Sequence, residues 1–177
     1  MHNLTRFPDW LLISTVLISF TFDRLSKNIV SNWLAYGESW PSDTFIKINH
    51  ATNSGSAFGL FPNQTMILII ASIFAIGFLV YFYTKHAVST RILRFAVGLQ
   101  LGGAAGNLLD RIKDGTVVDF IDVGPWPIFN IADSSIVVGM AILLGYFLIK
   151  RDSVDNNSEV EPVLVNSNES NEPNHIT

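Results

Sequence analysis

The chain contains 177 residues, and its composition excludes most classes of soluble protein, because only 15% of residues are charged and 49% are hydrophobic, against about 25% charged in a typical soluble domain. The absence of cysteine excludes disulfide frameworks, thiolate zinc sites and cysteine nucleophiles. The net charge of -4 arises in residues 152–177, which hold six acids and no Lys or Arg, and no basic patch with interleaved aromatic residues predicts a nucleic-acid partner.

The first predicted element is a membrane helix over about residues 10–33. Its apolar start of 13 residues follows Arg6 and has the size of a signal-peptide core. No small-residue cleavage pattern comes after it. Instead the chain continues with Asp23 and Lys27, and an acid four residues before a lysine favours an uninterrupted helix. We therefore expect an uncleaved first span.

Three further apolar segments predict spans over about residues 63–84, 91–110 and 130–150. No Asp, Glu, Lys or Arg occurs between Ile48 and Thr84, and at 1.5 Å per residue the run 66–83 would be about 27 Å long, close to the thickness of a bilayer core. The other two runs are shorter and extend through flanking residues that reach the interface. The predicted fold is an all-α polytopic membrane protein with four transmembrane helices.

The distribution of basic residues predicts the orientation. The connection 85–94 carries three basic residues and no acid, and Lys150 and Arg151 close the fourth span, so the positive-inside rule places both termini in the cytoplasm. Residues 1–151 form the predicted membrane domain. Residues 152–177 are rich in Asn, Ser, Glu and Pro, and we expect them to be a disordered acidic cytoplasmic tail.

The two outer segments contain strand-like patterns. Residues 34–62 alternate apolar and polar side chains around Thr44 to Ile48, and residues 116–121 form a β-branched run after a Lys-Asp-Gly turn signal. We expect the first of these segments to form a small extramembrane sheet.

Acidic side chains gather where the predicted spans meet the outer face. An ionisable group at membrane depth is costly and therefore indicates function. We interpret Asp122 as a solvated loop charge, and we consider Asn130 a better cap for the fourth helix than Asp133. The five acids are Asp23, Asp110, Asp119, Asp122 and Asp133.

The third span is rich in small residues, since seven of the fifteen residues 95–109 are Gly or Ala, which predicts close helix packing. Gly103, Asn107 and Arg111 share one helix face at a spacing of four. This face is therefore also predicted to admit a substrate backbone. Asp110 and Arg111 have a second interpretation as members of an ion pair, either with each other or with another helix.

Two carboxylates that meet at the lipid-water boundary do not both stay ionised. Such a pair can activate a water against a peptide carbonyl and protonate the departing amine, as in aspartic proteases. Asp119 lies among Val and Phe residues and Asp133 begins an apolar helix, so desolvation favours a proton shared between them. Asp110, beside Arg111, is expected to stay ionised.

Five motifs occur in order: Asp23 with Lys27, Asn53-Ser54-Gly55-Ser56-Ala57-Phe58-Gly59, Gly106-Asn107-Leu108-Leu109-Asp110-Arg111, Val118-Asp119-Phe120, and Phe129-Asn130-Ile131-Ala132-Asp133. With them the chain resembles, over about residues 10–150, the lipoprotein signal peptidase (signal peptidase II) family of bacterial inner-membrane aspartic peptidases. The family's architecture implies four helices, a small extracytoplasmic β-cradle and a flap-like outer loop. One departure is the short loop 120–132, only thirteen residues long.

The resemblance also implies roles and partners. Asp119 and Asp133 would be catalytic, Asp23 and Lys27 a structural pair, and no metal or cofactor would take part. The substrate would be a diacylglyceryl-modified prolipoprotein, cleaved just before its lipidated cysteine near the outer face of the inner membrane. We expect a monomer surrounded by membrane lipid. Substrate-binding or supporting roles would fall on Asn53, Gly103, Asn107, Asp110, Arg111 and Asn130.

Three other functions fit parts of the pattern. A rhomboid-like serine protease would pair Ser54 or Ser56 with a histidine, and of the four histidines only His50 lies on the outer side. A small proton or cation transporter would use membrane acids as relays, but it predicts charges near mid-membrane and an internal repeat. A divalent ion could be held by Asp110, Asp119 and Asp133 together.

Overall fold

The structure is a computed structural model that describes residues 9–55, 64–85 and 90–160, with side chains up to residue 150. It contains four helices and three short strands in the order α1, β1, β2, α2, α3, β3, α4. The chain divides into two units, Met1–Leu143 and Leu144–Thr177, and the boundary falls within α4. Every residue of the predicted site belongs to the first unit.

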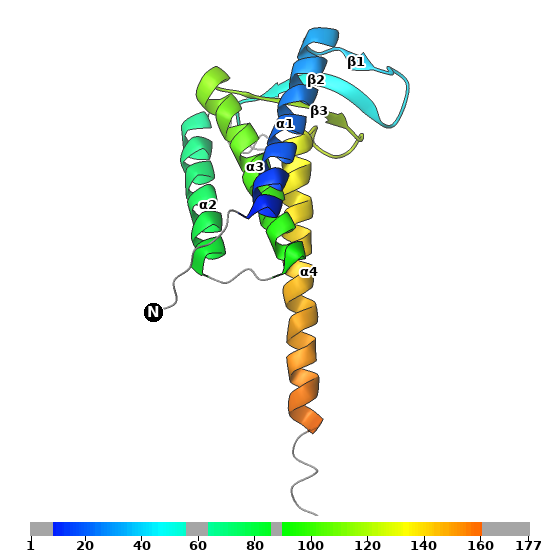
Figure 1. The fold of residues 1–177 in the computed structure, drawn as a ribbon. Coiled ribbons are helices and arrows are strands. Elements are labelled where there is room, and N and C mark those ends of the chain that lie inside the picture. The colour runs from blue at the N-terminus through cyan, green and yellow to red at the C-terminus, as the bar shows by residue number, and fades with distance from the viewer. Residues whose placement is uncertain (1–8, 56–63, 86–89, 161–177) are drawn as a thin grey trace, which may run out of the picture. The chain divides into compact units, whose positions relative to one another are not determined.

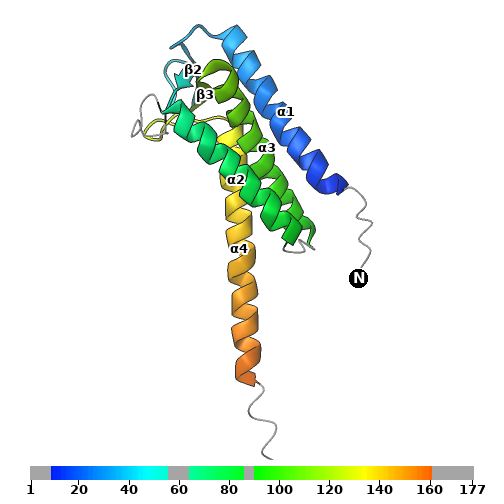
Figure 2. The same ribbon diagram turned by 90° about the vertical axis from the view of Figure 1, so that its left-hand side faces the viewer.

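The helices are α1 (Trp10–Trp33), α2 (Thr65–Lys85), α3 (Arg91–Asp114) and α4 (Ile131–Val160). Within the first unit α3 lies between α1 and α2 and also contacts the beginning of α4 (Figures 1 and 2). The bounds of α1 agree with the predicted first span, whereas α3 continues four residues beyond the predicted end at residue 110. It ends at Gly115, whose φ of 72° is a left-handed conformation that glycine adopts without strain.

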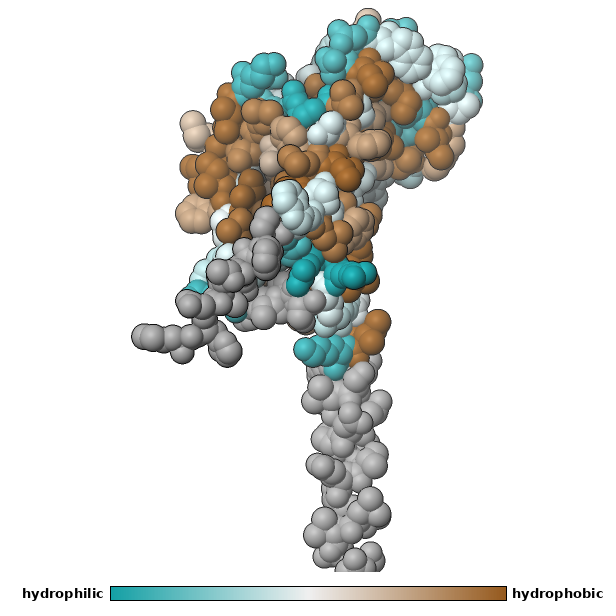
Figure 3. Space-filling view, viewed as in Figure 1, coloured by the Kyte–Doolittle hydropathy of each residue, from teal (hydrophilic) through white to brown (hydrophobic). Residues whose placement is uncertain are grey.

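Among the described residues, three helical segments are long and apolar enough to cross a membrane: α2, α3 and residues Ile131–Lys150 of α4. Apolar side chains cover much of the visible surface of the helices (Figure 3). In α2 no residue is buried, and Phe74 and Phe78 are 73% and 65% exposed. An apolar surface of this extent is typical of contact with lipid. Helix α1 has the required length, but Asp23, Arg24 and Lys27 reduce its hydropathy.

The small residues of α3 allow close approach of its neighbours, and this part of the prediction is confirmed. A Cβ atom added at Gly102 would lie 2.7 Å from the Cβ of Ser19 in α1, and one added at Gly103 would lie 2.4 Å from the carbonyl oxygen of Ala132 in α4. Gly103 therefore faces the backbone of α4 and not an open groove. Two further glycines of α3 pack against α1 in the same way, Gly98 and Gly106.

The strands β1 (Ser39–Trp40), β2 (Lys47–Asn53) and β3 (Val117–Asp122) form one antiparallel sheet in the order β1-β2-β3. The sheet lies at the end of the first unit where α1 ends and α2 begins (Figure 1). After a shift in register between Ile48 and Ala51, Ala51 pairs with Asp119 and Asn53 with Val117. Because alternate residues of a strand share one face, Asn53 and Asp119 lie diagonally on the same face. The predicted small sheet is confirmed.

A small hydrophobic core joins the sheet to the helices. Val30 and Leu34 at the end of α1 and Phe120 in β3 are 5%, 6% and 5% exposed. Apolar residues from three other positions pack against them, which fixes β3 between α1 and the start of α4: Ile48, Ile121 and Ile131.

The segment between β3 and α4 folds back onto the sheet. The backbone N–H groups of Phe120 and Ile121 donate to the carbonyl of Phe129, and Phe129 N–H donates to the carbonyl of Ile121. This return brings residue 130 beside β3. Residues 123–130 contain no helix, so this short loop does not form a flap helix.

Helix α4 differs from the predicted end of the fourth span at residue 150. It continues to Val160, ten residues beyond that predicted end. Once a helix is established, each further residue adds a hydrogen bond at little cost, and no Gly or Pro interrupts this stretch. Pro162 follows two residues after the helix ends, and proline disfavours helix at the residue before it. Residues 161–177 lie outside the described residues.

Candidate active site

A cavity of about 580 Å³ opens where the sheet meets α3 and α4. Polar side chains from four elements line it, and they include both carboxylates of the predicted pair. The remaining wall is apolar and comes from α2, α4 and the returning segment 126–129. The polar lining residues are Asn53, Asn107, Arg111, Asp119, Asp133 and Ser134.

Asp119 is held in β3 by two amides. One carboxylate oxygen accepts a hydrogen bond of 2.6 Å from Asn130 Nδ2, and the other accepts one of 3.3 Å from Asn53 Nδ2. Burial raises the pKa of Asp119 to about 6, and the negative charge of Asp133 adds to this, although the two amides and Lys27 act in the opposite direction. A carboxyl group with this pKa exchanges a proton near neutral pH, as an acid-base catalyst must.

Asp133 lies in the first turn of α4 and is held from two sides. Its Oδ1 accepts a hydrogen bond of 2.7 Å from Asn107 Nδ2, and its Oδ2 accepts one of 3.3 Å from the backbone N–H of Asn130. Asn130 Oδ1 in turn accepts from the backbone N–H of Asp133 at 3.0 Å. This reciprocal cap satisfies two backbone donors. The prediction that Asn130 caps the helix is confirmed.

Asn130 links the two carboxylates and is fully buried, with 0% exposure. Its side-chain N–H groups lie within hydrogen-bonding distance of Asp119, the carbonyl of Val118 and Asn107 Oδ1. Because its carbonyl caps α4 while its amide nitrogen contacts β3, one side chain fixes the strand carrying Asp119 relative to the helix carrying Asp133. The two carboxylates therefore share one wall of the cavity.

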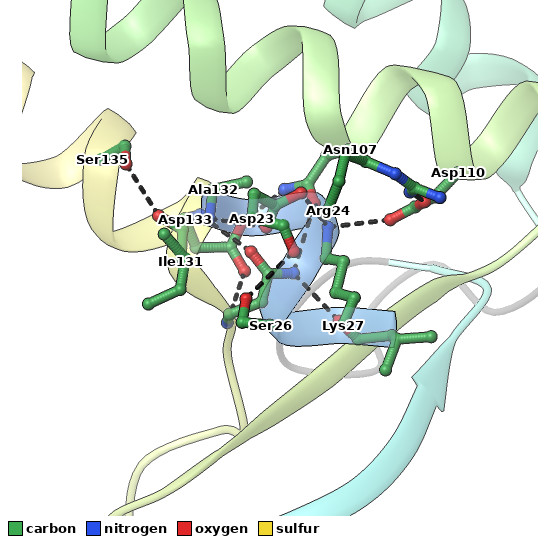
Figure 4. A network of polar contacts seen from close by, with 12 residues as sticks. Asp23, Arg24, Ser26, Lys27, Asn107, Asp110, Ile131, Ala132, Asp133 and Ser135 are labelled. Carbon is green, nitrogen blue, oxygen red and sulfur yellow. Dashed lines mark hydrogen bonds and ion pairs between the residues drawn. The ribbon is translucent and has the colours of Figure 1, made fainter. Parts of the chain in front are cut away.

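Beneath this wall lies a buried charge cluster formed by α1 and α3 (Figure 4). Lys27 Nζ lies 2.8 Å from Asp23 Oδ2, from Asp110 Oδ2 and from Asn107 Oδ1. Arg24 forms a second ion pair with Asp110, and Asp23 Oδ1 accepts from the backbone N–H of Ala132 at 3.0 Å. The predicted Asp23–Lys27 ion pair is present.

The structure separates the two interpretations of Asp110 and Arg111: Asp110 forms an ion pair, and Arg111 lines the cavity. The partners of Asp110 are Lys27 and Arg24 in α1, so the pair is between helices. Arg111 lines the cavity, and its Nη1 donates to the carbonyl of Asn107 at 3.4 Å. The guanidinium thus lies on the cavity side of α3 and the carboxylate on the side of α1.

Most of the predicted site residues meet in this region. Asn53, Asn107 and Arg111 line the cavity, and Asn130 supports its two carboxylates. Gly103 and Asp110 do not line it: the former packs against α4 and the latter is buried toward α1.

Arg24 belongs to the buried charge cluster although it was not among the predicted site residues. A second cation next to Asp23 in an apolar helix was the available signal. The apolar wall of the cavity was also not predicted, because apolar side chains in a membrane protein do not by themselves indicate a site. Its residues are Leu68, Val117, Trp126, Pro127, Ile128, Phe129, Val137 and Val138.

The contacts also bear on the alternatives. His50 is bound through Nδ1 to the carbonyl of Leu34 at 2.9 Å and packs edge-on against Tyr36, so it is already engaged away from Ser54. Ser56, the other candidate nucleophile, lies outside the described residues. Asp110 is neutralised by two cations, which removes it from a metal site shared with the two other acids.

Comparison with known proteins identifies the family. Residues 15–149 match the family described as signal peptidase (SPase) II. The chain belongs to the signal peptidase II family. It is accordingly a peptidase, and the aspartic class predicted from its acids is the class of this family.

Individual relatives cover most of the chain. It is 40% identical to the lipoprotein signal peptidase of Halothermothrix orenii over 133 residues, which are 74% of this chain and 90% of the relative. It is 39% identical to that of Syntrophotalea carbinolica over 150 residues, covering 80% and 92% of the two chains. A solved structure described as a bacterial membrane enzyme is 31% identical, has a TM-score of 0.78, and is matched over 83% of this chain and 93% of its own.

Proposed function

We propose that this signal peptidase II cleaves the signal peptide from diacylglyceryl-modified prolipoproteins, just before the lipidated cysteine, with Asp119 and Asp133 as the catalytic dyad. The observation that supports the dyad is geometric: both carboxylates lie on one cavity wall and are joined through Asn130. Asp119 and Asp133 are the two cavity acids without a lysine or arginine ion pair among the described residues.

In the proposed reaction one carboxyl group of the dyad is protonated and the other is ionised. The ionised group removes a proton from a water molecule, whose oxygen attacks the scissile carbonyl carbon. The protonated group donates a hydrogen bond to the carbonyl oxygen, and the dyad then delivers a proton to the departing amine. Asn53, Asn107 and Asn130 keep the carboxylates in place throughout, because an amide N–H can donate to a carboxyl oxygen in either protonation state.

The cavity suits an apolar peptide segment. Leu68 of α2 and Val137 and Val138 of α4 form its apolar wall, while Arg111 and Asn53 place donors near the carboxylates. A signal peptide beside an acyl-modified cysteine presents apolar surface together with backbone and ester carbonyls. The lining residues therefore complement this substrate in both respects.

We further propose that α1 is the fourth membrane span and that both termini lie in the cytoplasm, with the dyad near the outer face. Helix α1 has 24 residues, about 36 Å at 1.5 Å per residue. Its charges are compatible with a bilayer because Asp23 and Lys27 are 0% and 3% exposed and pair with each other.

The test uses purified protein in detergent and a diacylglyceryl-modified prolipoprotein, with cleavage followed by its mobility shift on a gel. Asp119→Asn, Asp133→Asn and the double variant should fall to about the same low rate, because members of one catalytic unit are not additive. All three should remain folded, since Asn nearly preserves the volume. Substantial cleavage by either well-folded single variant would refute the dyad.

The same experiment separates the competing functions. The unmodified prolipoprotein measures whether the lipid is required. A transporter would leave both substrates intact, and a serine protease would remain active in both Asp variants.

A further inference from the structure

Lys27 makes contacts that a structural ion pair does not require. Lys27 Nζ lies 2.8 Å from each of three oxygen atoms: it forms ion pairs with Asp23 Oδ2 and Asp110 Oδ2, and it donates a hydrogen bond to Asn107 Oδ1. The first two neutralise its charge. The third is the carbonyl of a neutral amide whose other end binds a carboxylate of the dyad.

This third contact determines which way the Asn107 amide points. Asn107 Oδ1 accepts from Lys27 at 2.8 Å and from Asn130 Nδ2 at 3.2 Å, so both of its lone pairs face donors. If the amide turned over, its NH₂ group would face the ammonium and the Asn130 amide, which are both donors. The orientation that remains directs Asn107 Nδ2 to Asp133 Oδ1 at 2.7 Å.

We infer that Lys27 is a positioning residue of the reaction, which acts through the Asn107 amide to hold Asp133 and to set the charge balance of the dyad. This inference rests on the proposed function, because it assumes that Asp119 and Asp133 perform the catalysis. Lys27 itself touches neither the cavity nor, in the proposed reaction, the substrate.

Charged groups surround the dyad from several elements. Arg111 of α3 lines the same cavity as the two carboxylates of β3 and α4, and Lys27 of α1 reaches Asp133 through Asn107. Asn53 and Asn130 add neutral donors. Lys27 is 3% exposed, and water screens a buried charge only weakly. Its positive charge opposes the increase in the pKa of Asp119 that burial causes.

Arg24 provides a matched control. It is a cation on the same helix and pairs with the same Asp110, but it has no hydrogen bond to Asn107 among the described residues. Its side chain is 29% exposed. If Lys27 acted only as a partner of Asp110, removing either cation should have the same effect.

The experiment measures kcat and its pH dependence for Lys27→Met, Lys27→Arg and Arg24→Met, with the lipidated prolipoprotein in detergent. In Lys27→Met we expect kcat to fall about 100-fold, since a misplacement near 1 Å costs about that factor. The alkaline limb of the pH profile should move upward, because a nearby cation favours the ionised form. Lys27→Arg retains a donor and the charge, so the limb should stay at its wild-type position.

Folding is controlled with a charge-balanced variant. Lys27→Met leaves Asp23 without its cation, whereas Asp23→Asn with Lys27→Met restores neutrality and retains an oxygen acceptor for the Ala132 N–H. This double variant should keep the fall in kcat, because Asn107 still lacks its lysine donor, while its pH profile should return toward that of the wild-type protein. Arg24→Met should lower the melting temperature without moving the profile.

The inference is overturned if folded Lys27→Met keeps the wild-type kcat and pH profile, or if the charge-balanced double variant keeps the wild-type kcat. It is also overturned if Arg24→Met shifts the profile equally, since general loss of positive charge would then explain the effect. Failure of the dyad is separate, because it would appear as cleavage by Asp119→Asn or Asp133→Asn, whatever the Lys27 variants do.

Discussion

The contact between Gly103 and Ala132 predicts that Gly103→Ala, which adds one methyl group outside the cavity, will impair catalysis. A Cβ at residue 103 would lie 2.4 Å from the carbonyl oxygen of Ala132, whereas carbon and oxygen atoms in weak contact are about 3.3–3.6 Å apart. The two helices must therefore separate by about 1 Å in Gly103→Ala. The obstacle is backbone, so a change of side-chain rotamer does not relieve it. Asp133 is the next residue after Ala132 and moves with it.

We expect kcat on the lipidated prolipoprotein to fall about 100-fold in Gly103→Ala, because a displacement of about 1 Å at a reacting group costs this factor. The free energy of unfolding should fall by about 1–3 kcal/mol, as in other overpacked interiors. Gly77→Ala is the matched control, since Gly77 lies inside α2 with nothing within 4 Å of the added Cβ. It should keep full activity and gain slight stability from the better helix former.

Two measurements on Gly103→Ala test whether the helix contact fixes the position of Asp133. Thermal unfolding in detergent measures packing, and single-turnover cleavage per folded molecule measures the position of Asp133. If Gly103→Ala matches Gly77→Ala in both, the helix contact is not as rigid as described. If it loses stability but cleaves at the wild-type rate, the contact supports folding without fixing Asp133.

The remaining predictions concern Asp119, Asp110 and the C-terminal segment. Because the pKa of Asp119 is raised from 3.8 to about 6, its carboxyl group binds protons more tightly in the folded state than in the unfolded state. The free energy of unfolding of the wild-type protein should therefore decrease as pH rises from about 4 to about 6, by up to about 3 kcal/mol. Asp119→Asn should lack this decrease in pH-dependent thermal unfolding; an unchanged slope would contradict the assigned shift. Asp110→Asn removes the carboxylate that pairs with Lys27 and Arg24, and it should lower the folded yield because breaking a buried pair costs about 3–5 kcal/mol. Molecules that fold should still cleave at a measurable rate. A stable but wholly inactive variant would instead make Asp110 catalytic. Deletion of residues 152–177 should leave cleavage in detergent nearly unchanged, because the deleted segment lies outside the unit that contains the cavity; a folded truncated protein that cannot cleave would refute this.

Local sequence patterns predicted the helices and strands that are determined by residues close together in the sequence. The apolar run and the i,i+4 pair of Asp23 and Lys27 predicted α1, and the β-branched run predicted β3. The acids at the ends of spans predicted which carboxylates would meet. Each of these depends on residues within a few turns or within one strand, so periodicity and spacing were sufficient.

The features that sequence reasoning did not reach depend on contacts between distant segments. Arg24 and Asp110 are 86 residues apart, and the side of α3 that carries Asp110 cannot be assigned to α1 until the helices are packed. Gly103 has the spacing of a cavity residue. Whether a glycine faces substrate or a neighbouring backbone depends on the position of α4, which the sequence of α3 does not encode.

The arrangement of neutral and charged groups around Asp119 and Asp133 is the one that the proposed chemistry requires. A carboxylate that binds a lysine or arginine directly is held ionised, so a group that must gain and lose a proton needs a different support. Asn53, Asn107 and Asn130 provide it, since their amides bind Asp119 and Asp133 without requiring a charge. The fully paired Lys27 then lies one hydrogen bond further away, where it can orient an amide and moderate the field without fixing either proton. In such a site a substitution of an amide should impair the position of the carboxylates, and a substitution of the lysine should also move their pH dependence.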